Sequence, residues 1–331
     1  MFENLKSRFK NNPRLYYAMS IAATWAGVGS LMMGIEMAQK YGIIPFLLWA
    51  LGNTLACIVF GIFAPMIPKL REVFNSRVMK IIVGLMCPFQ VWVSMNGIQS
   101  VFADTPLTSD YGMMLAYMAA LFFIWLLFSF GTVRNVLTDH ISWVAVYGVA
   151  TVLTVAAIIY SKGNMVPLSW GLENASVGLE KCLLLIPGAF LYPYYFELLD
   201  YNDQNGDGTK KVNIRRAFIE GGLLFGAYLT FTFLLSWTNF SPALNIIKAF
   251  LIVLIAISSL SSFQYSIYLT FGHKLGLIIN LAAVAMWQLL MPMGVMGVWT
   301  LMSTIRIFIV IGAIVTAIAW AAWSKRKAVS V

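Results

Sequence analysis

The sequence predicts an all-α integral membrane protein with ten transmembrane helices, arranged as two inverted repeats of five helices each. Three observations predict this class. Hydrophobic side chains make up 60% of the 331 residues and charged ones only 11%, whereas an ordinary soluble domain carries about 25% charged residues. The apolar residues gather in ten segments, each near the length of about 20 residues that a helix needs to cross a bilayer. Each half of the chain holds five segments, and the first segment of each half is interrupted.

Short polar gaps separate these segments, and their charge alternates along the chain. With the N-terminus inside, 17 of the 22 Lys and Arg fall in inner segments, three lie at the outer side and two lie within spans. Because cytoplasmic loops are enriched in Lys and Arg, we expect both termini in the cytoplasm. The expected spans cover residues 15–38, 44–66, 78–103, 110–130, 138–160, 177–199, 214–237, 244–270, 275–292 and 298–323.

The ten spans divide the chain into two halves of nearly equal length. Residues 15–160 form the first five-helix repeat and residues 177–323 the second, with an outer connecting loop over 161–176. A cytoplasmic segment over 1–14 and a basic tail over 324–331 flank them. Because five is odd, the second half must enter the membrane in the opposite orientation from the first.

The first span of each half is interrupted at a similar depth. Span one contains Gly27 and Gly29, and span six contains Pro187-Gly188 followed by Pro193. Interrupted helices at corresponding positions of inverted halves indicate a binding site near the midplane of the membrane. The alternative is that the glycines only permit close helix packing and the prolines only kink the helix.

Composition excludes several classes of function. The net charge of +9 forms no basic stripe with interleaved aromatic residues, so we expect no nucleic-acid partner. We expect neither an enzyme nor a cofactor, because the sequence holds no metal-ligand cluster, nucleophile constellation or nucleotide-binding glycine loop. Cys57, Cys87 and Cys182 lie inside apolar segments and are expected to be buried thiols. The lipid bilayer and a small-molecule solute remain as partners, and the oligomeric state stays open.

Span eight carries a dense group of hydroxyls, with four serines in the five positions from Ser258 to Ser262. Hydroxyls and exposed backbone carbonyls are the oxygen ligands that hard cations prefer. The alternative is that these serines bond to their own helix or let a neighbouring helix approach closely.

Three stretches together resemble the sodium:solute symporter family. Residues 23–30 are similar to that family's broken first core helix, and residues 131–139, Gly-Thr-Val-Arg-Asn-Val-Leu-Thr-Asp, resemble its signature between core helices four and five. The serine run resembles its eighth core helix. The resemblance implies a LeuT-type fold of the amino acid-polyamine-organocation superfamily, reduced here to the ten-helix core. Many members carry Gln-Arg after the sixth-helix break, where this chain reads Phe196-Glu197-Leu198.

The resemblance also implies a sodium site between core helices one and eight, with sodium as the coupling ion and no other metal. The implied sodium ligands are the backbone carbonyls of Ala22, Trp25 and Ile255 and the hydroxyls of Ser258 and Ser259. The substrate is expected beside this site. Polar or aromatic candidates at those positions are Thr24, Gly29, Ser30, Asn96, Gln99, Tyr192, Tyr194 and Gln264.

Two charged residues within spans suggest a gate. Glu36 lies in the outer half of span one and Arg306 lies in the outer half of span ten, and charges inside a membrane span are functional by default. We expect an ion pair between them that closes the outer gate. The alternative is a permanent structural pair, or separate pairing with Lys248. Arg134 and Asp139 are expected to cap and anchor helices at the cytoplasmic face.

The loop from Asp203 to Gly208 matches the opening of a calcium loop. Ile214 occupies the twelfth position, where a bidentate Glu is required. We therefore expect a flexible turn between spans six and seven.

The leading hypothesis is a secondary active transporter of a cellular inner or plasma membrane. It would carry a small polar organic solute by sodium-coupled symport with alternating access. One alternative is a non-transporting binding, sensory or regulatory module of LeuT type. Another is a proton-coupled or uncoupled permease in which Glu36, Glu197 or Glu220 titrates. No residue pattern selects the solute.

Overall fold

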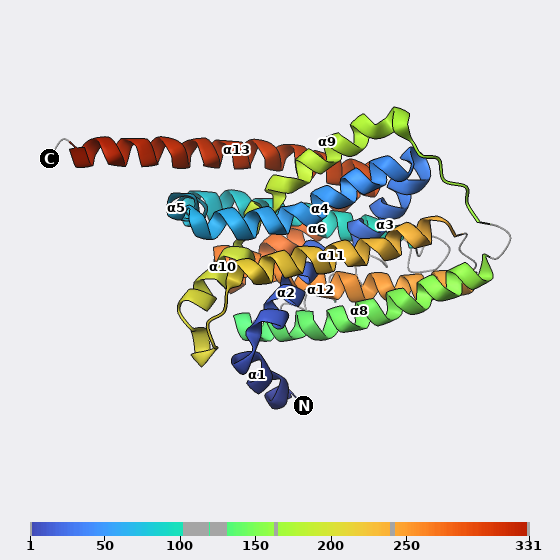
Figure 1. The fold of residues 1–331 in the computed structure, drawn as a ribbon, viewed down its shortest axis with the longest axis horizontal. Helices are drawn as coiled ribbons and strands as arrows, with labels where there is room; N and C mark the ends of the chain where they lie inside the picture. Colours follow the sequence, from blue (N-terminus) through green and yellow to red (C-terminus); the bar gives the residue numbers. More distant parts are fainter. Residues whose placement is uncertain (1, 102–118, 120–130, 162–164, 239–241, 330–331) are drawn as a thin grey trace.

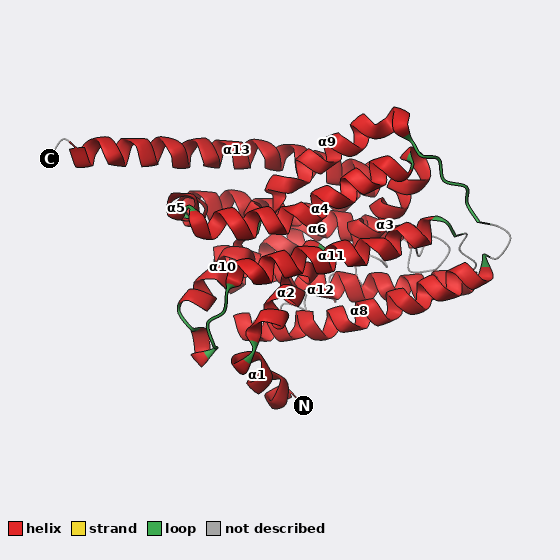
Figure 2. Cartoon of the chain, in the orientation of Figure 1, coloured by secondary structure: helices red, strands yellow, loops and turns green. Residues whose placement is uncertain are grey.

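The computed structural model describes residues 2–101, 119, 131–161, 165–238 and 242–329, and these residues form helices and connecting segments without a strand (Figure 2). Six helices are long and apolar enough to cross a membrane, and the bent pair of α2 and α3 makes a seventh. The expected all-α membrane class is therefore confirmed. The ten-span inverted repeat stays a prediction, because the expected span over 110–130 lies almost wholly outside the described residues.

The helices of the first half coincide with expected spans one, two, three and five. α2 and α3 form the broken first span, which ends in a π-helical turn, and α5 is a short amphipathic helix between α4 and α6. In order, the elements are α1 (Phe2–Asn11), α2 (Pro13–Trp25), α3 (Val28–Glu36), η1 (Met37–Tyr41), α4 (Ile43–Met66), α5 (Pro68–Asn75), α6 (Arg77–Val101) and α8 (Thr132–Tyr160).

The helices of the second half coincide with expected spans six to ten. Expected spans eight and nine form one element, α12, which leaves helical geometry at Gly272, where φ is +73°. In order, the elements are η3 (Leu172–Asn174), α9 (Ala175–Leu185), η4 (Ile186–Leu191), α10 (Pro193–Asp203), η5 (Gly206–Gly208), α11 (Ile214–Ser236), α12 (Pro242–Leu290), η6 (Met291–Met293) and α13 (Gly294–Val329).

Both expected interruptions lie where the sequence placed them. α2 and α3 bend by 62° around Ala26 and Gly27, whose ψ angles of 83° and 167° are not helical. In span six, the short 3-10 helix η4 separates α9 from α10, and Pro193 begins α10. Proline is tolerated in the first turn of a helix because no acceptor is available there for an N–H.

Helix α2 lies at the centre of the packing, in contact with α8, α11 and α12. Around it, α4 packs against α9 and α11, and α6 packs against α12 and α13. Figure 1 shows α4, α8, α11 and α13 running along the longest axis, with α5 and α10 toward one end and the segment that leads into α9 toward the other. This arrangement places the broken α2–α3 helix among α6, α12 and α13.

Candidate functional site

A wholly buried carboxylate lies where α2, α8 and α12 meet. Asp139 of α8 is 0% exposed and accepts hydrogen bonds from four serine hydroxyls and one amide. The donors are Ser20 at 2.5 Å, Ser261 at 3.1 Å, Ser262 and Asn135 at 3.4 Å and Ser258 at 3.5 Å. None of the ion pairs that the structure gives among its described residues involves Asp139. Its negative charge is thus surrounded by neutral donors.

Helical spacing explains how these donors converge. Ser258, Ser261 and Ser262 are three and four residues apart, so they share one face of α12. Asn135 precedes Asp139 by one turn on the same face of α8. The role expected for Asp139, a cap at the cytoplasmic face, is wrong because α8 begins at Thr132, about two turns earlier. The sequence signal was available, since an ionisable residue inside an apolar helix is a functional candidate.

The cluster extends along α2 toward the break. The Thr24 hydroxyl lies 2.7 Å from the Ser262 hydroxyl and donates to the Ser20 carbonyl at 2.8 Å. The Tyr194 hydroxyl of α10 lies 2.7 Å from that of Ser20. Two residues expected at the substrate site, Thr24 and Tyr194, therefore belong to the Asp139 cluster. The group of Asp139, Ser20, Thr24, Tyr194, Ser258, Ser261 and Ser262 is called the Asp139 cluster below.

The residues expected to bind sodium lie in and beside this cluster. Ser258 contacts Asp139 directly, whereas the buried Ser259 hydroxyl has no hydrogen-bond partner. The Ala22 carbonyl accepts from the Ala26 N–H at 2.9 Å, and the Trp25 carbonyl accepts from the Gly27 N–H at 3.1 Å. The fifth expected ligand, the carbonyl of Ile255, belongs to a residue of α12 that is 0% exposed.

A small cavity opens at the break between α2 and α3. Gly29, Ser30 and Tyr192 of the expected substrate residues line it, as do Trp25 and Arg306. Asn96 is buried elsewhere on α6, and Gln264 bonds to Asn280 within α12. The Gln99 side chain lies outside the described residues. Lining residues that the sequence did not single out for this site include Asn53, Gln90, Trp49 and Trp299.

Arg306 of α13 is the charged residue of this cavity and is 5% exposed. Its guanidinium carbon lies 5.4 Å from the centre of the Tyr192 ring, and Nη2 lies 3.5 Å from the Tyr192 hydroxyl. Because a guanidinium can only donate, the Gln90 amide presents its oxygen to Arg306, 3.1 Å from Nη1. In the part of the chain that the structure describes, Arg306 Nε has no hydrogen-bond partner.

The expected outer gate is not formed. Among the described residues the structure gives no ion pair between Glu36 and Arg306, because the Arg306 side chain turns inward to Gln90 and Tyr192. Glu36 is half-buried at the end of α3. The positive charge in the cavity thus faces neutral side chains rather than an acidic partner.

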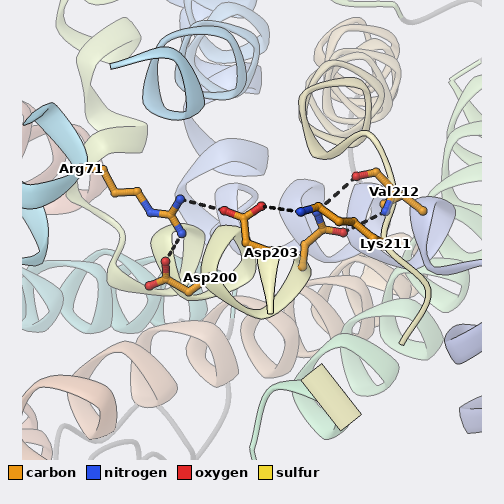
Figure 3. A network of polar contacts seen from close by, with 6 residues as sticks. Arg71, Asp200, Asp203, Lys211 and Val212 are labelled. Carbon is orange, nitrogen blue, oxygen red and sulfur yellow. Dashed lines mark hydrogen bonds and ion pairs between the residues drawn. The ribbon is translucent and has the colours of Figure 1, made fainter. Parts of the chain in front are cut away.

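At the end of the bundle where α5 and α10 lie (Figure 1), an ion-pair network connects these two helices (Figure 3). Arg71 of α5 pairs with Asp200 and donates from Nη1 to Asp203 at 2.9 Å. Lys211 Nζ lies 3.8 Å from the other carboxylate oxygen of Asp203. The Asn202 side chain exchanges hydrogen bonds of 3.1 and 3.2 Å with the Val212 backbone. These contacts hold the end of the broken sixth span against α5 and the segment before α11. In the predicted orientation this end is the cytoplasmic one.

The same contacts account for the segment that resembles a calcium loop. Both oxygens of Asp203 face cations, and Asn205 and Asp207 have positive φ angles of 50° and 51° that close a tight turn. In the described part of the chain, no three His, Cys, Asp or Glu side chains gather in a way that could hold a metal ion. Cys57 and Cys182 are buried free thiols, as expected, and the Cys87 side chain lies outside the described set.

Comparisons with known proteins were made for the whole chain. A scan against models of protein families finds no match, and a search of curated protein sequences finds none. Among solved structures, the chain is similar to a manganese transporter of Eremococcus coleocola in complex with an aromatic bis-isothiourea substituted compound. The similarity covers 95% of this chain and 72% of the other, with 15% sequence identity and a TM-score of 0.37. At these values the likeness bears on neither family nor function.

Proposed function

We propose that this chain is a secondary active transporter that couples the movement of a small polar organic solute to the binding of a cation, with sodium as the leading ion and alternating access as the mechanism. The observation that carries the proposal is the wholly buried carboxylate of Asp139 with its ring of serine hydroxyls. The cluster joins α2, α8, α10 and α12 beside the break between α2 and α3, and the solute cavity lies at that break.

A bound cation would offset the free-energy cost of burying the Asp139 carboxylate. A carboxylate buried without a positive partner is strongly disfavoured in an apolar interior, and hydroxyl donors compensate only part of the lost hydration. Sodium neutralises the charge and takes oxygen ligands alone, which is the ligand type that the cluster offers. The unpartnered hydroxyl of Ser259 supplies one further oxygen nearby on α12.

The cluster also supplies a physical connection between ion and solute. Ser20 and Thr24 belong to α2, whose last residue, Trp25, lines the cavity. A cation that draws Ser20 of α2 and the serines of α12 toward Asp139 therefore holds α2, and with it the wall of the cavity, in one position. Loss of the cation frees α2 to move against α12. In this mechanism, solute binding and ion binding each stabilise the same arrangement of α2.

A proton is the second candidate for the coupling ion, because protonation of Asp139 would also remove the buried charge. The acids expected to titrate in a proton-coupled permease are placed differently. The Glu197 carboxylate accepts from the Thr132 hydroxyl at 3.0 Å, and Glu220 pairs with Arg14 and Arg216. Among Glu36, Glu197, Glu220 and Asp139, only Asp139 is wholly buried, so Asp139 is the proton site in this version.

Ion binding is testable before the solute is known. We expect purified protein in detergent to bind radiolabelled sodium. The buffer contains potassium in place of unlabelled sodium, at constant ionic strength. Asp139→Asn should abolish this binding, because it removes the negative charge while keeping the shape of the side chain. Asp207→Asn is the matched control, since Asp207 is exposed in a turn that asparagine also adopts.

Three results decide among the possibilities. Sodium binding that survives Asp139→Asn would contradict the assigned ion site. Stability that depends on pH but not on sodium, and loses this dependence in Asp139→Asn, would select the proton. Intact ion binding without sodium-driven or proton-driven uptake of amino acids, sugars, carboxylates or nucleobases into proteoliposomes would refute transport and support a sensory or regulatory module.

A further inference from the structure

We infer that the solute is a small organic anion whose carboxylate binds between Arg306 and the first turn of α3. This inference rests on the proposed function, because it takes the cavity at the α2–α3 break as the solute site. It adds the chemical class of the solute, which neither the fold nor the Asp139 cluster specifies. Three independent features of the cavity carry it.

The first feature is the uncompensated charge of Arg306. Its side chain is buried, and every contact that the structure gives it is with a neutral group, the Gln90 amide or the Tyr192 ring and hydroxyl. Its Nε is directed to no acceptor. A buried cation without an anionic partner is costly, and a planar guanidinium matches a carboxylate with two parallel hydrogen bonds. A ligand carboxylate would supply the missing partner.

The second feature is the N-terminus of α3, a helix of nine residues. Gly27 is its N-cap and has no side chain, so no side-chain oxygen at the N-cap accepts a hydrogen bond from the amide groups of the first turn. The Ser30 N–H bonds back to the Gly27 carbonyl at 2.9 Å, and among the described residues the N–H groups of Val28 and Gly29 form no such bond with a residue outside the helix. Free amides and the helix dipole favour an anion at this end. Gly27 and Gly29 also leave the backbone open to the cavity.

The third feature is the composition and size of the cavity. Among the described residues that line it there is no Asp or Glu, so no carboxylate is in place to pair with the ammonium of an amino acid or with another cation. The aromatic side chains of Trp25, Trp49, Tyr192 and Trp299 form much of the remaining wall. The cavity is partly open, and its space of about 30 Å³ holds about two water molecules or one carboxylate group. A small monocarboxylate therefore fits better than a sugar.

The two sites then form a balanced pair of charges. Sodium or a proton neutralises Asp139, and the solute carboxylate neutralises Arg306. Each ligand removes one buried charge of the protein, so the doubly occupied state carries no uncompensated charge at either site. Single occupancy leaves one buried charge exposed to the apolar interior. Because the charge of Asp139 repels an anion and the charge of Arg306 repels a cation, each bound ligand removes a repulsion acting on the other, which favours the binding of both together, as symport requires.

The test uses binding alone, in detergent and without a gradient, so that it is independent of transport. Acetate, propanoate, lactate, pyruvate and benzoate are compared with their uncharged amides by thermal stabilisation and titration calorimetry, with chloride and simple amines as further probes. The variants are Arg306→Gln, Arg306→Lys and, as the matched control, Arg215→Gln, because Arg215 is exposed at the start of α11.

We expect at least one carboxylate to bind to the wild-type protein and to Arg215→Gln while its amide does not. Loss of the charged hydrogen bonds in Arg306→Gln should weaken binding by roughly tenfold or more. Arg306→Lys should retain part of the affinity, since it keeps the charge and loses the paired geometry. If Arg306→Gln does not fold, Arg306→Lys and the comparison of acids with amides in the wild type still show whether a carboxylate binds at Arg306.

Several results would overturn the inference. They are equal binding of acids and amides, binding of amines or of chloride alone, unchanged affinity in Arg306→Gln, and no binding of any carboxylate. The proposed function is tested separately. Carboxylate binding without uptake would refute transport and keep the anion site, whereas ion-driven uptake of an uncharged solute would keep transport and refute the anion site.

Discussion

The two charged side chains at the centre of the bundle, Asp139 and Arg306, are stabilised in different ways. Asp139 accepts five hydrogen bonds from neutral donors on three helices. Arg306 has one amide and one tyrosine beside it and retains a nitrogen without a partner. Buried charged groups in membrane proteins are expensive and mark ion or substrate pathways. In the proposed function, the two residues mark two ligand sites of opposite charge preference.

The hydroxyl of Ser259 gives a test at this scale. Ser259→Ala should lower sodium affinity by roughly tenfold, because one oxygen ligand is lost, while the unfolding temperature without sodium stays the same or rises slightly. Removing a buried hydroxyl that has no partner relieves its desolvation cost. Sodium titrations followed by thermal unfolding measure both quantities.

Ser266→Ala is the control for that experiment. The Ser266 hydroxyl bonds to the Ser262 carbonyl of its own helix at 2.9 Å, so its loss should leave sodium affinity unchanged. Equal losses of affinity in the two variants would show that any serine truncation in α12 disturbs the site and would remove Ser259 from the ligand set.

At the scale of elements, two broken helices and a close helix pair shape the site. The break between α2 and α3 exposes backbone amides to the cavity, and η4 separates α9 from α10. Helix α9 is held against α4 by glycines. A Cβ at Gly52 would lie 2.5 Å from the Cα of Cys182, and one at Gly178 would lie 2.5 Å from the Cα of Pro45. The two helices can approach this closely only without side chains at these positions.

Alanine substitution tests this close packing. Gly52→Ala and Gly178→Ala should each lower the free energy of unfolding by about 1 to 3 kcal/mol, the usual cost of overpacking, because the added methyl group meets backbone atoms that cannot rotate away. Gly148→Ala is the control, since a Cβ there meets nothing within 4 Å. Alanine favours helix over glycine by about 1 kcal/mol. Thermal unfolding in detergent that ranks Gly148→Ala as the most harmful of the three would contradict the packing shown here.

At the scale of the whole molecule, the Asp139 cluster and the Arg71 network restrain different sets of helices. The Arg71 network holds α5 to α10, and α10 also contributes Tyr194 to the Asp139 cluster. In the proposed alternating-access mechanism, contacts that close one side of the bundle must open while the other side closes. The network lies far along the bundle from the loop that leads into α9 (Figure 1), so we assign it to closure of the inner side.

Opening of this side can be followed through Cys57. Its thiol is buried, 3.7 Å from the Tyr195 hydroxyl of α10, so it becomes reactive only when α10 moves away from α4. Arg71→Gln should increase the rate of maleimide labelling at Cys57 several-fold, up to about tenfold if the two ion pairs together contribute about 1.4 kcal/mol. High salt should increase the wild-type rate in the same direction.

Lys69→Gln is the control for loss of a cation on the same helix, because Lys69 pairs with Glu72 within α5 and reaches the Trp320 ring of α13, but makes no ion pair with α10 among the described residues. Its labelling rate should equal that of the wild type. If Arg71→Gln labels Cys57 no faster than Lys69→Gln, the network is an ordinary surface feature and not a closure of the inner side.

The sequence by itself determined the membrane class, the positions of the helices outside 102–130 and the two interruptions, at Gly27 and before Pro193. These features depend on hydropathy and on backbone preferences of Gly and Pro, which are local along the chain. It also predicted Ser258 and Ser259 of α12 as sodium ligands, and this stays a prediction. It did not identify Asp139 as their partner, and it assigned Arg306 a partner, Glu36, that the structure does not give it.

Only the tertiary structure decided which charges meet which groups. Ser20 and Asp139 are 119 residues apart in the chain, and Arg306 and Tyr192 are 114 apart. Such contacts depend on which helices pack together and on how each helix is rotated about its axis. Hydropathy indicates neither inside a membrane, because lipid and the protein interior are equally apolar. The ring of serines around Asp139 and the unpartnered nitrogen of Arg306 are therefore properties of the packed bundle rather than of any one segment.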